Sequence, residues 1–195
     1  MGETPAFVPM ARLVDEIGRL TAGTVDAGRM QRLLSSTLVE PESLDPYVNF
    51  EPGRYTRHLV HKSAEVEILV LCWAAGSRAP IHGHEGELCW ARVERGALSF
   101  TNYREVSRRP LHVTPAGPAI VGGAGHLDGP ADLHAVENLP GFGGPAVSVH
   151  VYAKPYDECD IYDLAEGVVQ RVRLRYDSVP AGFPRSVTPP PGEAG

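Results

Sequence analysis

From Tyr55 onwards the chain consists of short segments rich in β-branched and aromatic residues, separated by Gly, Pro or Asp at intervals of about ten residues. Examples are VEILVLCWAAG, LHVTPAGPAIVG and AVSVHVYAKP. Short strands with regular turn signals are typical of a β-sandwich or a β-barrel. The 21 glycines and 18 prolines also disfavour long helices. The sequence therefore predicts a mainly β fold.

The N-terminal part has a different pattern. Apolar residues recur at helical spacing over residues 8–21 and again over residues 25–39, which predicts two short amphipathic helices. We expect residues 1–45 to form a helical segment packed on a barrel made by residues 46–176. Residues 177–195 are rich in Pro and Gly, and we expect them to form a flexible tail.

Charge and cysteine content exclude some classes of protein. The formal net charge is −6 with no basic run, which argues against nucleic acid as a partner. No stretch of about 18 apolar residues is present, so we expect no membrane span. Cys72, Cys89 and Cys159 are an odd and sparse set, which favours a reducing cytoplasm over a disulfide framework. The absence of a clear apolar patch leads us to expect a monomer.

The segment APIHGHEGELCWARVERG, residues 79–96, contains two histidines one residue apart. Residues i and i+2 of a strand point to the same face, so His82 and His84 could direct two imidazoles at one metal ion. Neutral imidazole suits Fe, Zn, Cu and Ni. The alternative is a pair of solvent-exposed histidines, or one core histidine bonded to a backbone carbonyl group.

The flanking residues favour the metal site. The segment has the spacing of the first motif of the cupin superfamily, which consists of a glycine, two histidines, a glutamate and a second glycine. The matching residues are Gly76, His82, His84, Cys89 and Gly96, with cysteine in place of the usual glutamate. HAVEN supplies His134 and Asn138, which resemble the end of the second cupin motif. This resemblance implies a jelly-roll-like β-barrel, a fold that carries many unrelated functions.

Five blocks narrow the resemblance to the cysteine dioxygenase family. They occur in the same order as in that family: YTRHLV (55–60), ILVLCWAAG (68–76), IHGHEGELCW (81–90), LHAVEN (133–138) and AVSVHVYAKPYDEC (146–159). The resemblance implies Fe(II) held by His82, His84 and His134. It also implies an enzyme that uses O2 to oxidise the thiol of L-cysteine to cysteine sulfinic acid. Three neutral ligands would leave coordination positions for a thiolate and O2.

The same resemblance assigns a substrate-binding group. Arg57 matches the arginine that binds the substrate carboxylate, and a guanidinium fits a carboxylate in a two-pronged manner. Tyr55 matches a tyrosine near that carboxylate, and Cys159 matches a cysteine near the mouth of the pocket. The alternative for Cys159 is a half-exposed thiol without a role in binding. The alternative for Arg57 is an ordinary arginine on the surface of a strand.

Cys89 and Tyr152 match the two residues that a thioether joins in the animal enzymes of this family. The alternative is a buried, unlinked Cys89 that packs as a small apolar residue. Ser148, His150 and Tyr152 alternate along one strand face, and in the family this trio forms a hydrogen-bonded relay behind the iron. The alternative for His150 is that it is itself a metal ligand.

One departure from the family affects the substrate. After Tyr152 the animal pattern is Ser-Pro-Pro, whereas here Ala153, Lys154 and Pro155 follow. This loop helps to shape the pocket, so 3-mercaptopropionate or a larger, ergothioneine-like thiol are alternatives to cysteine. A non-catalytic cupin that binds a metal or a small molecule belongs to a different class of function, and its mark would be a missing ligand or missing pocket residues. A cupin isomerase or a zinc enzyme is a further alternative, and zinc has no redox chemistry.

Overall fold

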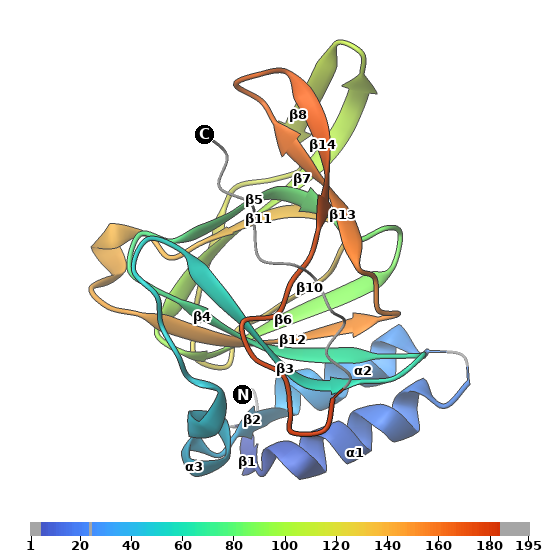
Figure 1. Ribbon diagram of the computed structural model, residues 1–195, viewed down its shortest axis with the longest axis vertical. Helices are drawn as coiled ribbons and strands as arrows, with labels where there is room; N and C mark the ends of the chain where they lie inside the picture. The colour runs from blue at the N-terminus through green and yellow to red at the C-terminus, as the bar shows by residue number, and fades with distance from the viewer. Residues whose placement is uncertain (1–4, 24, 184–195) are drawn as a thin grey trace.

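The computed structural model describes residues 5–23 and 25–183 of the 195-residue chain (Figure 1). The helices are α1 (Met10–Thr21), α2 (Ala27–Ser36), α3 (Pro41–Leu44), η1 (Asp45–Tyr47) and η2 (Pro140–Phe142). The strands are β1 (Ala6–Val8), β2 (Thr37–Val39), β3 (Tyr55–Lys62), β4 (Glu67–Trp73), β5 (Arg78–Gly83), β6 (Leu88–Arg95), β7 (Ala97–Arg108), β8 (Leu111–Pro115), β9 (Ile120–Gly123), β10 (Leu127–Ala131), β11 (Leu133–Glu137), β12 (Ala146–Ala153), β13 (Glu158–Asp163) and β14 (Val168–Arg173). The predicted mainly β barrel with short N-terminal helices is confirmed.

Two antiparallel sheets form the barrel. One has the strand order β10-β6-β12-β4-β3, and the other has the order β14-β13-β5-β11-β7-β8, with β9 added to β7. Leu69 and Leu71 of the first sheet pack inside the barrel with Phe100 and Val136 of the second. Because side chains alternate along a strand, the neighbouring residues of β4 point away from this interior.

The outer face of the first sheet is covered by the N-terminal helices, which lie beneath β3, β4, β12 and β6 in Figure 1. Leu13 and Ile17 of α1 and Leu34 of α2 pack there against Val70 and Val149. As a result β4 and β12 are buried along their whole length, on both faces. This explains why their sequences are almost continuously apolar instead of alternating.

A buried ion pair joins the helices to the barrel. Arg92 Nε lies 2.6 Å from Glu94 Oε1, and both side chains are almost fully excluded from solvent. Arg92 also donates to the carbonyl oxygen of Leu34 and to Thr37 Oγ1, while Glu94 accepts from the amide of Val39. The pair therefore satisfies polar groups where the chain leaves α2 and enters β2.

The second amphipathic segment is shorter than predicted. Its helix ends at Ser36, and residues 37–39 form β2, which pairs in parallel with β1. Thr37 and Val39 are β-branched and all three residues of β2 are buried, so they fit a strand better than a helix.

The last motif glycine occupies a position that only glycine fits. Gly96 has φ +74, and a Cβ atom there would lie 2.6 Å from the carbonyl oxygen of Pro145. A side chain at this position would therefore force β6 and the start of β12 apart.

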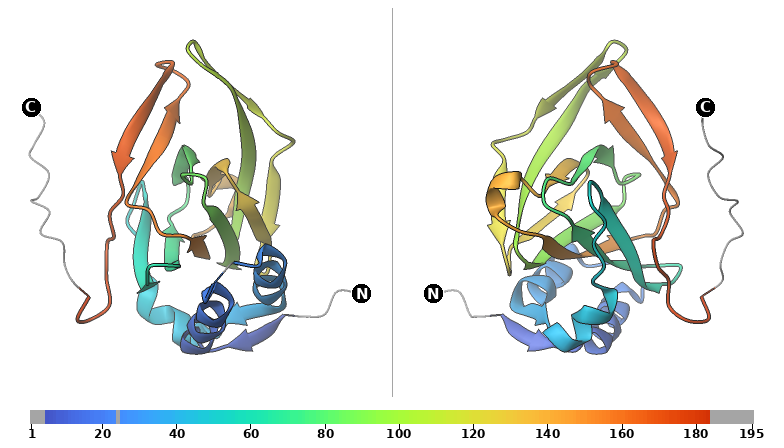
Figure 2. Two further views of the ribbon diagram at one scale, coloured as in Figure 1. Left: turned by 90° about the vertical axis from the view of Figure 1, so that its right-hand side faces the viewer. Right: turned by 60° about the vertical axis from the view of Figure 1, so that its left-hand side comes forward.

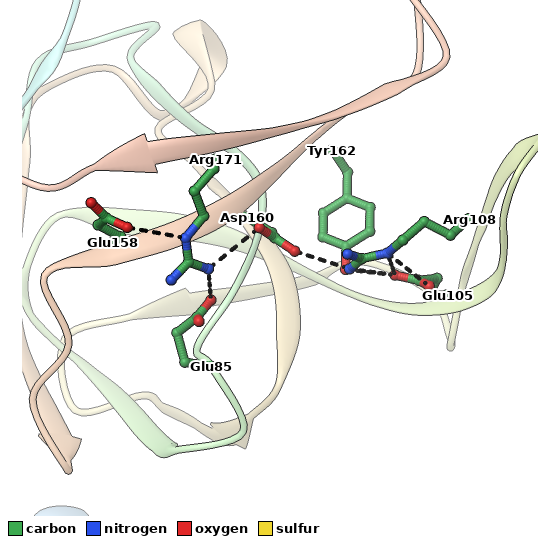
Figure 3. Close-up of polar contacts among 7 residues, drawn as sticks. All are labelled: Glu85, Glu105, Arg108, Glu158, Asp160, Tyr162 and Arg171. Carbon is green, nitrogen blue, oxygen red and sulfur yellow. Dashed lines mark hydrogen bonds and ion pairs between the residues drawn. The ribbon is translucent and has the colours of Figure 1, made fainter.

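An exposed ion network supports the end of the barrel opposite the helices, where two hairpins extend from the sheet (Figure 2). Arg171 of β14 lies 2.7 Å from Glu85, in the turn after β5, and Arg108 of β7 lies 3.0 Å from Asp160 of β13 (Figure 3). Solvent screening makes the contribution of each such exposed pair to stability small. Together they tie the β13–β14 hairpin to two other parts of the second sheet.

The division of the chain into 1–45, 46–176 and 177–195 stays a prediction. Residues 184–195 of the expected tail lie outside the described residues. Residues 177–183 run alongside β3, where the carbonyl oxygen of Ser178 accepts from the amide of Leu59 and Phe183 packs near the interior core. None of the helices in the described ranges has the length and apolar character that a membrane span requires.

The ion pair of Arg92 and Glu94 gives the first prediction. Glu94→Gln leaves the Arg92 charge buried without its partner, so the free energy of unfolding should fall by about 3–5 kcal/mol. Chemical denaturation monitored by circular dichroism measures this loss. In the matched control, Glu16→Gln breaks the solvent-exposed pair with Arg12 and should change stability by less than about 1 kcal/mol. Equal losses in the two variants would contradict the structural role of the buried pair.

Candidate metal centre

Three histidines from two distant parts of the chain meet inside the barrel. His82 lies on β5 and His84 directly follows it, while His134 lies on β11, the antiparallel neighbour of β5. His82 and His134 are paired residues in this ladder. One ligand atom from each imidazole lies within 4.8 Å of the others. Among the described residues this is the cluster with the geometry to hold a metal ion, and it matches the three predicted ligands.

Hydrogen bonds set the orientation of all three rings. Nδ1 lies 2.8 Å from the carbonyl oxygen of Pro80 in His82 and 2.8 Å from that of Ala131 in His84. Nδ1 of His134 lies 3.3 Å from Oδ2 of Asp128. Because each acceptor requires a proton on Nδ1, each Nε2 carries a lone pair. This is the arrangement by which outer hydrogen bonds orient metal-binding histidines.

Two of these Nε2 atoms are unsatisfied hydrogen-bond acceptors within the described structure. Nε2 of His84 and Nε2 of His134 are buried, and neither has a hydrogen-bond partner in the described part of the chain. A buried polar atom without a partner is costly, and a metal ion would satisfy both atoms together. The residues present therefore fit a metal.

The environment keeps the imidazoles of His82 and His84 neutral. Burial lowers the pKa of His84 to about 3, and the nearby His134 acts in the same direction. Burial and the proximity of His134 also hold the pKa of His82 well below its usual range. Only the neutral form of histidine binds metals, so protons compete poorly with a metal at neutral pH. Imidazole ligands suit Fe, Zn, Cu and Ni.

A hydrogen-bonded chain runs along β12 beside the three histidines. Nε1 of Trp73 donates to Ser148 Oγ at 2.9 Å, Ser148 Oγ lies 3.0 Å from Nε2 of His150, and Nδ1 of His150 lies 3.3 Å from the Tyr152 hydroxyl. Since the indole is a donor only, the Ser148 hydroxyl can donate to Nε2 of His150. The His150 proton then lies on Nδ1 and points at the phenol oxygen. This leaves the Tyr152 hydroxyl hydrogen available to another acceptor.

The structure orders the predicted trio as the sequence pattern suggested and keeps His150 out of the metal cluster. Burial holds the pKa of His150 well below its usual value and raises that of Tyr152 well above it. Both groups are therefore neutral at pH 7.

Cys89 and Tyr152 are direct neighbours across two strands. They are paired residues of β6 and β12, and both side chains are buried. Side chains that are paired across antiparallel strands lie on the same face, with Cβ atoms about 5 Å apart. Burial raises the pKa of the Cys89 thiol, so the unlinked side chain is a neutral thiol.

Arg57 lies on β3 with its guanidinium group in the interior of the barrel. Its Nη2 is 3.9 Å from Oε2 of Glu67, while its buried Nε has no hydrogen-bond partner among the described residues. The interpretation of Arg57 as a surface residue of a strand is therefore wrong. Tyr55, two residues earlier, stacks on Trp73 with 4.9 Å between the ring centroids.

Cys159 is buried, with 2% of its surface exposed, so the alternative of a half-exposed thiol is wrong. The reason is that its thiol faces the interior, near Arg57 and Tyr156.

Three further residues at the site were missed by sequence reasoning. Tyr156 places its ring 6.2 Å from that of His84 and 5.4 Å from that of Tyr152, measured between centroids. Asp128 bonds His134, and Glu67 faces Arg57. Glu67 carried a signal, because it is a charged residue in an otherwise apolar strand.

The peptide bond between Ala153 and Lys154, where the family pattern is broken, is cis.

The bond from His134 to Asp128 gives the second prediction. Asp128→Ala leaves Nδ1 of His134 without its acceptor, so affinity for divalent metal should fall by about 10- to 100-fold. Competition of the metal-free protein with a chelator for Fe(II) or Zn²⁺ measures this affinity. Asp15→Ala, which removes an exposed carboxylate on α1, should leave it unchanged. Unaltered affinity in Asp128→Ala would show that the carboxylate does not support the ligand.

Comparison with known proteins places this geometry in a family. Residues 3–165 match the model of the family described as cysteine dioxygenase type I. The chain is 26% identical over 184 residues to cysteine dioxygenase type 1 of Homo sapiens, covering 91% of this chain and 92% of the human protein. It is 27% identical over 173 residues to the same enzyme of Rattus norvegicus, covering 87% of this chain and 86% of the rat protein.

Solved structures resemble the barrel more distantly. An RmlC-like cupin protein from Desulfovibrio desulfuricans is 22% identical with a TM-score of 0.37, covering 56% of this chain and 91% of that protein. A double-stranded β-helix protein from Klebsiella pneumoniae is 20% identical with a TM-score of 0.37, covering 57% and 86%. The match to the family model, which spans most of the residues, carries the assignment. This chain belongs to the cysteine dioxygenase type I family.

Proposed function

We propose that this protein is a thiol dioxygenase that converts L-cysteine and O2 to cysteine sulfinic acid. The reaction adds both oxygen atoms to the sulfur atom, so R–SH and O2 give R–SO2H without a further reductant. The observation that carries the proposal is the combination of three converging imidazoles with an interior guanidinium whose Nε has no hydrogen-bond partner among the described residues.

The three histidines, His82, His84 and His134, would hold Fe(II). When bound there, Fe(II) would supply the redox chemistry that joins O2 to the thiol sulfur. Because all three ligands are neutral, the protein would leave the double positive charge of the site uncompensated. Such a site favours the thiolate form of the substrate over the thiol.

Arg57 would bind the substrate carboxylate. Its buried Nε, which no group in the described ranges bonds, is a donor that a carboxylate oxygen can satisfy, and a two-pronged pair of this kind also fixes orientation. Tyr152, with its hydroxyl hydrogen left available by the bond from His150, would donate to the bound substrate. Tyr55 and Cys159 would complete the walls of the substrate pocket.

Arg57 would suit any small thiol that carries a carboxylate. A dioxygenase of 3-mercaptopropionate, or of an ergothioneine-like thiol, is therefore the alternative substrate assignment for the same chemistry. Lys154, at the point where the chain departs from the family pattern, lies close enough for its amide to donate to Glu87. A cytoplasmic location, a monomeric state and the absence of a nucleic-acid partner accompany the proposal as predictions.

Product identification tests the function. The iron-loaded protein, incubated with ¹⁸O2 and separate samples of L-cysteine, 3-mercaptopropionate and ergothioneine, should yield cysteine sulfinic acid with two ¹⁸O atoms by mass spectrometry. Arg57→Gln should lower kcat/KM for cysteine by about 100-fold, because a charge-assisted pair contributes about 3 kcal/mol. Turnover of another thiol alone would reassign the substrate, and no sulfinic acid from any thiol would reject the proposal.

We further propose that Cys89 and Tyr152 form a thioether in the active protein. Their positions as direct neighbours across β6 and β12 support the bond. The S–H bond of Cys89 and one aromatic C–H bond of Tyr152 would break as the S–C bond forms, and O2 would take up the two hydrogen atoms and leave as H2O2. After turnover, intact-mass analysis should show a loss of two hydrogens, and this loss should be absent in Cys89→Ser. An unchanged mass in active protein would show that the bond does not form.

A further inference from the structure

Glu67 is a buried carboxylate on the interior face of β4. Its side chain is 2% exposed. In the sheet it is the paired residue of Lys62 on β3 and of Tyr152 on β12. The carboxylate therefore lies in the same interior as the Tyr152 phenol and the Arg57 guanidinium, although neither the histidine motifs nor the relay on β12 uses it.

Three side chains hold this carboxylate. Oε1 of Glu67 lies 3.1 Å from Nζ of Lys62 and accepts a hydrogen bond from the hydroxyl of Tyr176. Lys62 also donates to the Tyr176 hydroxyl at 2.9 Å and to Asp157 at 2.8 Å. Oε2 of Glu67 faces Nη2 of Arg57 at 3.9 Å. One carboxylate oxygen is thus anchored and the other faces the guanidinium.

Tyr176 belongs to a segment that covers the edge of the first sheet. Residues 174–178 run beside β3, which is the last strand of that sheet (Figure 2). The amide of Asp177 donates to the carbonyl oxygen of Arg57, and the amide of Arg57 donates to Asp177 Oδ2, each at 2.7 Å. The segment therefore holds the backbone of Arg57 directly and its side chain through Tyr176 and Glu67.

Packing alone does not explain why a carboxylate is buried beside Arg57. A buried carboxylate is costly unless it is paired and hydrogen-bonded, and Glu67 is both. Arginine has a long side chain with about 2 kcal/mol of rotamer entropy, so a bound anion must restrain it unless the protein already does. The contact of 3.9 Å restrains Nη2 and leaves Nε without a partner in the described part of the chain.

Charge also favours one kind of ligand. Lys62 pairs with Glu67 and with Asp157, whose side chain lies mostly in solvent, so Glu67 divides its charge between Lys62 and the more distant Arg57. A substrate carboxylate would give Arg57 a direct partner, whereas a thiol without a carboxylate would not.

We propose that Glu67, fixed by Lys62 and Tyr176, is a positioning residue that orients Arg57 for the carboxylate of the substrate. The segment 174–178 is then part of the substrate-binding site. This inference rests on the proposed function, since it requires a thiol with a carboxylate as ligand.

Two variants test the inference, Glu67→Gln and Tyr176→Phe. The probes are L-cysteine and cysteamine, which differ in the carboxylate. Binding to the iron-loaded protein is measured by calorimetry without O2, and kcat and KM are measured with O2. We expect Glu67→Gln to weaken cysteine binding about tenfold and Tyr176→Phe to weaken it about threefold. Cysteamine binding should stay within about twofold in both variants, and KM for cysteine should rise more than kcat falls.

Tyr47→Phe is the matched control. Tyr47 is another half-buried tyrosine, but it packs against the cluster between the helices and the first sheet. Its substitution should leave the affinity for both thiols unchanged. Melting temperature and iron content, compared across the three variants, exclude a general loss of structure. Tyr176→Phe keeps the ring in place, so it provides the test if Glu67→Gln does not fold.

Two kinds of result would overturn the inference. Cysteine affinity within twofold of the unaltered protein would show that Glu67 does not orient Arg57. Equal weakening of cysteine and cysteamine would show a structural role only. If the unaltered protein bound and oxidised none of the thiols, the proposed function would fail first and the inference with it.

Discussion

The antiparallel pairing of β5 with β11 is the constraint on which the site depends. It places His82 opposite His134 although the two residues come from distant parts of the chain. Side chains alternate along a strand, so a slip of one residue in this register would turn one imidazole away from the other. The bond from the His84 amide to the carbonyl oxygen of Asp132 joins the same two segments just beyond the ladder. The ligand cluster is thus a direct consequence of strand register.

The polar groups inside the barrel fall into two sets. Most are satisfied by one another, as in the chain from Trp73 through Ser148 and His150 to Tyr152, and as in the contacts of Glu67. The other set includes three buried nitrogens at the candidate site that have no partner in the described residues, Nε2 of His84, Nε2 of His134 and Nε of Arg57. Buried groups that lack partners destabilise a fold, so their persistence marks where a cation and an anion are expected to bind.

The sequence predicted most of the site because the chemistry is local. Two histidines at i and i+2 must share a strand face, and the alternation in SVHVY puts Ser148, His150 and Tyr152 on one face. The sequence was less informative about the side chains that form hydrogen bonds or ion pairs with these groups. Glu67 and Tyr176 are 109 residues apart, and Asp128 meets His134 where the chain passes from β10 in the first sheet to β11 in the second.

By itself the sequence determined the mainly β architecture, the residue types that can hold a metal and the family to which the chain belongs, since these follow from periodicity and short motifs. Only the tertiary structure decided that Arg57 points inward beside Glu67, that Cys89 is the neighbour of Tyr152, and that the segment after β14 covers β3. The physical reason is that these contacts depend on strand order and register across the whole chain. Long-range pairings of this kind leave no periodic signal in the residues that make them.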